Sequence, residues 1–155
     1  MARLVSRQDL DVDVDFYGWC LQDVDDSMVP VSFPEGFEGG AFLTAHEGRL
    51  DFTSAGHTHT AALAAEVWDG APAAAGRGDG WDEVAESRIS CSSGQLAVWA
   101  VAGGPMPTYV QLPDHSAGWR VRAHCRGREA VRQLALEGVP EGVERYLVQF
   151  WLDEA

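Results

Sequence analysis

The sequence predicts a mainly β protein: a single antiparallel β-sandwich, jelly-roll-like, with about eight or nine strands and at most one short helix. Three observations support this prediction. Apolar and polar residues alternate with a period of two in several segments, turn residues separate those segments, and six tryptophans are spread over them. The chain shows no internal repeat and no long linker, so we expect residues 1–155 to form one domain.

The clearest alternation lies near the N-terminus. Acidic and apolar residues alternate strictly in residues 9–16 (Asp-Leu-Asp-Val-Asp-Val-Asp-Phe), which indicates a strand with one buried face and one row of carboxylates in solvent. The strand continues into residues 17–21, where Gly18 suggests a bulge. Residues 23–40 are rich in Asp, Pro and Gly and predict a loop.

A hairpin is predicted next. Glu47-Gly48 separates two alternating runs, 41–46 and 49–54, and glycine takes a positive φ at little cost. The alternation places Arg49 and Asp51 on the solvent face of the second strand.

The remaining elements follow at short intervals. Residues 69–80, rich in Ala and Gly, predict a surface loop, and residues 128–136 predict the one short helix, because their apolar positions share a face. The further predicted strands span residues 58–68, 81–91, 95–102, 108–112, 118–126 and 145–152.

The charge distribution bounds the function. The formal net charge is -13, and it comes entirely from residues 1–86, since the rest of the chain carries equal numbers of acidic and basic residues. Such a field repels phosphates, so we expect no direct nucleic-acid binding and no membrane binding, and we expect a basic protein as partner. The N-terminus lacks the apolar core of a signal peptide and the three cysteines are scattered, so we expect a cytoplasmic protein with reduced thiols.

Two features are candidates for partner binding. The first is a set of carboxylates near the N-terminus, whose alternative role is to solubilise a strand edge and discourage strand pairing. The second is Trp151, which the alternation places opposite Tyr146, Val148 and Phe150; if those three line the core, Trp151 is an exposed aromatic anchor, and if the sheet is covered on both faces it is buried. The carboxylates are those of Asp9, Asp11, Asp13, Asp15, Asp23, Asp25 and Asp26.

The only basic cluster lies on one predicted strand. Arg120, Arg122, His124 and Arg126 project from its polar face and could hold a carboxylate or phosphate ligand. The alternative is that they form ion pairs with the acidic first half of the chain, for instance with the row of aspartates.

Histidine provides a weak metal signal. His57 and His59 are two apart on a predicted strand and His46 lies across the hairpin, but no further ligand follows at the spacing a metal site needs, so surface roles are favoured and no cofactor is expected. The sequence also lacks a nucleophile elbow and a phosphate-binding glycine loop, so we do not expect an enzyme.

Several segments together resemble a known family. They are Gly48-Arg49-Leu50-Asp51-Phe52, the apolar strand to Val67, Glu83–Ser87, Gly94–Val98, and Leu112-Pro113 with Gly118–Val121. In this order they resemble the competence protein J type of β-sandwich, over roughly residues 36–126. The resemblance implies a small cytoplasmic protein that inhibits a nuclease of DNA uptake. The aspartate row and the Arg-rich C-terminal part lie outside it, and it assigns no site residue.

The sequence therefore predicts a non-catalytic acidic protein-binding module, an inhibitor or immunity-like partner of a basic protein such as a nuclease. One alternative is a small-ligand-binding sandwich or enzyme with an Arg- and His-lined cavity. Another is a structural subunit of a larger assembly.

Overall fold

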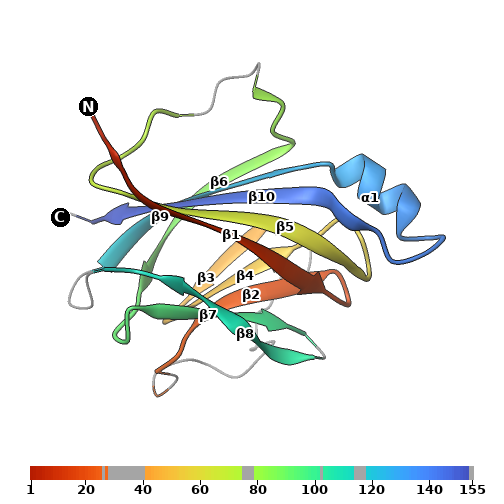
Figure 1. The fold of residues 1–155 in the computed structure, drawn as a ribbon, viewed down its shortest axis with the longest axis horizontal. Coiled ribbons are helices and arrows are strands. Elements are labelled where there is room, and N and C mark those ends of the chain that lie inside the picture. The colour runs from red at the N-terminus through yellow and green to blue at the C-terminus, as the bar shows by residue number, and fades with distance from the viewer. Residues whose placement is uncertain (26, 28–40, 75–78, 102, 114–117, 154–155) are drawn as a thin grey trace.

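Two five-stranded sheets pack face to face in the computed structural model, which describes residues 1–25, 27, 41–74, 79–101, 103–113 and 118–153 (Figure 1). These residues contain ten strands and one short helix. The predicted mainly β sandwich is therefore confirmed.

The first sheet, sheet A, contains the strand with the alternating aspartates at one edge. Its described strands pair antiparallel, as predicted, except for β5 and β10, which are parallel neighbours. The C-terminal strand lies at its centre. The strand order is β1 (Leu4–Val14), β5 (His59–Trp68), β10 (Glu141–Leu152), β9 (Gly118–Arg126) and β6 (Glu83–Ser90).

The second sheet, sheet B, is antiparallel throughout. Its order is β3 (Leu43–His46), β4 (Arg49–Thr53), β2 (Gly18–Asp23), β7 (Gln95–Ala100) and β8 (Gly104–Gln111). The predicted hairpin joins β3 to β4, and Gly48 has a φ of 71° in its turn. Arg49 is buried, which corrects its predicted exposure; its guanidinium Nε lies 2.9 Å from the Asp51 carboxylate, which compensates the charge.

The core lies between the sheets and is aromatic at one end. The rings of Trp19 and Phe52, from sheet B, stack at 4.1 Å, and Tyr146 of sheet A meets Trp19 edge-on at 4.9 Å. All three side chains are buried. Aromatic contacts therefore tie the two sheets together.

Helix α1 (Arg128–Leu134) begins directly after β9, as the sequence predicts, and buries Val131. Gly127 has a φ of 81° at its start, and a Cβ there would lie 2.1 Å from the Val143 carbonyl oxygen. Only glycine fits this turn. No helix in the described parts of the chain has the length and apolar character to cross a membrane.

One side chain closes the gap between the two sheets beside β1. The Gln8 amide donates to the Tyr109 carbonyl oxygen at 2.9 Å and accepts from the Gln111 backbone N–H at 2.8 Å. Gln8 thus links the edge strand β1 of sheet A to the edge strand β8 of sheet B. This link fixes the strand that carries the aspartates.

Candidate functional site

The aspartates of β1 form an exposed row. Asp9, Asp11 and Asp13, named here the acidic row, face solvent, whereas Val12 and Val14 between and after them are buried. The Asp9 side chain is 74% exposed and forms an ion pair with Arg7. The carboxylates stand clear because the β5 residues paired with them are small: Ala64, Ala62 and Thr60.

The predicted acids after β2 behave differently. Asp23 is buried and accepts hydrogen bonds from the Ser92 backbone N–H at 2.9 Å and the Ser93 hydroxyl at 2.5 Å. Burial opposes its ionisation, but these bonds outweigh burial and lower the pKa of Asp23. Asp25 is exposed, and its pKa is lowered by a hydrogen bond from Ser92. Asp26 lies outside the described residues. Asp23 therefore fastens a loop and contributes no surface charge.

An aromatic pair at the end of β1 is missing from the sequence prediction. Phe16 and Tyr17, named here the aromatic tip, form the turn between β1 and β2 and are 61% and 48% exposed. Both have positive φ, 50° and 63°, between the bridged residues Asp15 and Gly18. Their rings meet His57 edge-on, with centroids 5.2 and 5.0 Å away.

The aromatic tip is strained. A two-residue hairpin with positive φ at both positions is a type I′ turn, which favours Asn-Gly. Aromatic residues pay an energetic penalty in this conformation, because their Cβ approaches the backbone. The sequence offers no turn signal here, since Phe16 continues the alternation of the strand.

Trp151 is not the exposed anchor that the alternation suggested. It is buried, with the Arg122 guanidinium 5.1 Å above its ring. Arg122 in turn donates to the Pro72 carbonyl oxygen at 2.9 Å and faces Glu86 at 3.7 Å. The segment after β5 thus covers this part of the outer face of sheet A. Both faces of the sheet are therefore buried here, and the alternation does not distinguish an exposed face.

The predicted basic cluster does not form one site. Arg122 is buried as described, and His124 is 2% exposed, with Nδ1 3.0 Å from a carbonyl oxygen of β10 and its ring 5.1 Å from Trp81. Burial lowers the pKa of His124. Arg120 is half-buried, and Arg126 is exposed with its guanidinium 4.9 Å above Trp81. Arg122 pairs with Glu86 of the acidic first half, as the alternative predicts. Two strands separate the cluster from the acidic row, and among the described residues no ion pair joins the two.

The three candidate histidines are not brought together. His46 lies 3.1 Å from Asp51, His57 is exposed at the aromatic tip, and His59 is buried. Strand β5 begins at His59, so His57 precedes the strand and does not share its face. Within the described ranges, no group of three or more His, Cys, Asp or Glu is placed to hold a metal ion.

A Ser-His-Glu group occurs in the core but is inaccessible. The Glu144 carboxylate accepts hydrogen bonds from the Ser54 hydroxyl and the Tyr146 hydroxyl, each at 2.6 Å, and from the Ala55 backbone N–H at 3.0 Å. The His59 Nε2 lies 2.8 Å from the Ser54 oxygen. Because the single hydroxyl proton of Ser54 goes to Glu144, His59 does not activate this serine as a base would. The side chains of His59 and Glu144 have no exposure, so this group is structural.

The cysteines are free and unreactive by their environment. Burial raises the pKa of Cys20 and Cys125 to about 12 and that of Cys91 to about 11. A thiol is a nucleophile only as the thiolate, so none of the three is activated.

No protein-family model matches the chain, and no curated protein matches its sequence. A crystal structure of ComJ from Bacillus subtilis, described as an inhibitor of the DNA degrading activity of NucA, matches with a TM-score of 0.65 and 11% identity. This match covers 99% of both chains. The chain has a ComJ-like fold. A second structure, described as crocagin biosynthetic gene J, matches with a TM-score of 0.55 and 11% identity over 97% of both chains.

The ComJ-like fold extends beyond the segments that carry the sequence resemblance. Those segments end at residue 126, but the match to ComJ covers nearly the whole chain, including the strands β1 and β10. The aspartate-bearing strand and the C-terminal strand therefore belong to the common fold and are not additions to it.

Proposed function

We propose that this chain is a non-catalytic protein-binding module that inhibits a basic protein such as a nuclease. The contact surface is the acidic row together with the aromatic tip. The observation that carries the proposal is three exposed carboxylates on an edge strand that ends in two exposed aromatic rings. The ComJ-like fold supports it, because ComJ is described as inhibiting a DNA-degrading activity.

The mechanism is electrostatic occlusion. Alternate residues of a strand are about 7 Å apart, so the acidic row presents evenly spaced negative charges along one line. A nuclease binds phosphates through cationic groups, and carboxylates in their place steer association and cover the site. Exposed aromatic rings add the apolar contact area that typically dominates binding energy. The inhibitor acts in the cytoplasm, where free thiols such as these three persist.

The test is capture of the partner by matched variants. A tagged chain is expressed in a bacterial host, and co-purifying proteins are compared between the unaltered chain and Asp9→Asn/Asp11→Asn/Asp13→Asn. We expect a stoichiometric basic protein that the variant and a high-salt wash both lose.

A control with the same charge change shows whether position matters. Glu83→Gln/Glu137→Gln/Glu141→Gln removes three exposed carboxylates outside the acidic row and should retain the partner. If this control loses the partner equally, net charge and not the acidic row governs binding. A partner retained at high salt by all three chains would favour an assembly subunit held by apolar contacts.

A further inference from the structure

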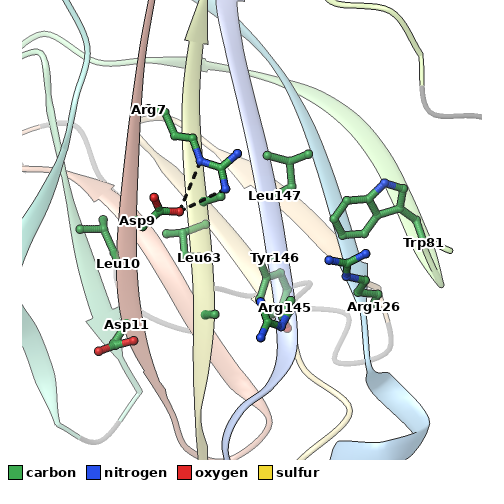
Figure 2. Close-up of a pocket in the computed structure, with 12 residues that line it drawn as sticks. Arg7, Asp9, Leu10, Asp11, Leu63, Trp81, Arg126, Arg145, Tyr146 and Leu147 are labelled. Carbon is green, nitrogen blue, oxygen red and sulfur yellow. Dashed lines mark hydrogen bonds and ion pairs between the residues drawn. The ribbon is translucent and has the colours of Figure 1, made fainter. Parts of the chain in front are cut away.

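A shallow groove runs along the outer face of sheet A beside the acidic row. Its volume is ≈ 450 Å³, and it lies between strand β1 and Trp81. Ala62 and Ala64 of β5 form its floor, since their side chains are too small to fill it. Figure 2 shows the acidic residues Asp9 and Asp11 on one side and the arginines Arg145 and Arg126 on the other.

The two arginines of the groove are direct cross-strand partners. Arg145 of β10 pairs with Arg126 of β9 in an antiparallel ladder, and both are exposed. Like charges in this position repel one another. Trp81 lies 4.9 Å below the Arg126 guanidinium and holds it over the groove.

Neither arginine forms an ion pair with a carboxylate among the described residues. In this chain of net charge -13, six of the ten arginines of the described ranges have a carboxylate within 4 Å, and Arg126 and Arg145 are among the four that do not. Those paired arginines are Arg7, Arg49, Arg88, Arg122, Arg128 and Arg132.

The sheet itself keeps the acidic wall away from the basic wall. Asp11 and Arg145 both pair with Ala62, from opposite sides of β5. Strands β1 and β10 are therefore two strand spacings apart, about 9.5 Å, and no ion pair among the described residues spans them. Arg126 and Arg145 thus lie beside an open floor, with no carboxylate of the described residues within ion-pair distance of either.

We propose that Arg126 and Arg145 bind an oxyanion group, a carboxylate or a phosphate, in this groove. Two adjacent guanidinium groups offer paired N–H donors that match the oxygens of such a group. The alanine floor leaves space for the body of the ligand. The acidic wall repels an extended polyanion such as nucleic acid, so the site takes a single anionic group, from a small molecule or from an acidic side chain of a protein.

The test uses the intact chain and defined probes. Inorganic phosphate, citrate and a capped glutamate peptide are titrated separately at constant ionic strength, while the arginine Nε–H and tryptophan indole N–H signals are followed by NMR. We expect saturable shifts of the Arg126, Arg145 and Trp81 signals. Saturation by phosphate or citrate assigns a small-molecule oxyanion, and saturation by the glutamate peptide alone assigns a protein side chain.

Matched variants decide whether the groove is responsible. Arg145→Gln and Arg126→Gln should each weaken the binding by at least about tenfold, because each removes charge-assisted hydrogen bonds. Arg132→Gln removes an exposed arginine of helix α1, outside the groove, and should bind as the unaltered chain does. Shifts that do not saturate with any probe, or equal weakening in Arg132→Gln, would overturn the proposal. Thermal melting shows that each variant is folded.

Discussion

At the scale of single residues, Glu144 is a fully buried carboxylate that accepts three hydrogen bonds. Its carboxylate, with no exposure, joins β10 to the end of β4 through Ser54 and Ala55 and to Tyr146 on its own strand. Glu144→Gln keeps the size of the side chain but places an amide N–H₂ donor next to hydroxyl and backbone N–H groups that are donors themselves. We expect a loss of about 3 kcal/mol in the free energy of unfolding, measured with urea.

The control for this prediction lies on the same strand. Glu141 is exposed at the start of β10, so Glu141→Gln should change the free energy of unfolding by less than about 0.5 kcal/mol. If Glu144→Gln is as stable as the unaltered chain, the hydrogen bonds that Glu144 accepts do not hold β10 to the end of β4.

Buried histidines make the stability depend on pH. Burial lowers the pKa of His124, and burial also lowers that of His59 against the opposing charge of Glu144. The unfolded chain therefore binds these protons first, and stability falls as the pH drops below about 6.5. Each histidine contributes a slope of at most about 1.4 kcal/mol per pH unit, which urea unfolding at several pH values between about 7.5 and 5 measures.

Two variants show which histidine causes this dependence of stability on pH. His124→Gln should flatten it, and His57→Gln, which replaces an exposed histidine, is the matched control. A slope that survives unaltered in His124→Gln would belong to other groups. The lowered pKa values of Asp23 and Asp25 affect stability only at still lower pH.

At the scale of elements, the turn between β1 and β2 exposes two aromatic rings in a backbone conformation that lowers the stability of the fold. Phe16→Asn/Tyr17→Gly introduces the residue pair that a type I′ turn favours. We expect the free energy of unfolding to rise by about 1 kcal/mol, because the relief of positive φ exceeds the loss of the ring contacts with His57. Thermal and urea unfolding measure this gain.

The same variant should bind the captured partner less tightly, since the aromatic tip is part of the proposed contact surface. A gain in stability with a loss of binding separates a functional role from a structural one. If the variant is instead less stable, the rings serve to pack the turn against His57.

Strand positions follow from local alternation, but burial of the outer face does not. The hairpin around Gly48 and the strand over residues 118–126 lie where the alternation predicts them. Trp151 and Arg122 are buried on the side that the alternation predicts to be exposed, because the segment containing Pro72 covers that side of their strands. A period of two identifies two faces and cannot say that a distant segment covers the second one.

The same limit applies to the site. The acidic row was predictable because a solvent-facing edge strand leaves its alternation uncovered. The aromatic tip was not, since its turn has no Gly or Asn at the positive-φ positions. The Arg126–Arg145 pair joins two segments through a register that only the folded sheet defines.

At the scale of the whole molecule, the topology makes folding depend on the last part of the chain. Strand β10 lies in the middle of sheet A, between β5 and β9, although it is the last strand in the sequence. It contributes Tyr146, Val148 and Phe150 to the core. The central pairing therefore forms only when the C-terminal residues are present.

Removal of residues 139–155 should consequently abolish folding. Burial of one large apolar side chain contributes about 1.5–3 kcal/mol, so the loss of three such side chains costs about 4.5–9 kcal/mol, which is comparable to the stability of a typical domain, about 5–15 kcal/mol. The backbone hydrogen bonds of the central strand are lost in addition. We expect no cooperative urea transition and collapsed dispersion in the NMR spectrum. Deletion of residues 1–3, which precede β1, should leave the cooperative urea transition and the dispersion of the NMR spectrum as they are in the unaltered chain. A peptide of residues 139–155 added in trans should restore the spectrum, whereas a cooperative transition in the truncated chain alone would mean that β5 and β9 can close the sheet without β10.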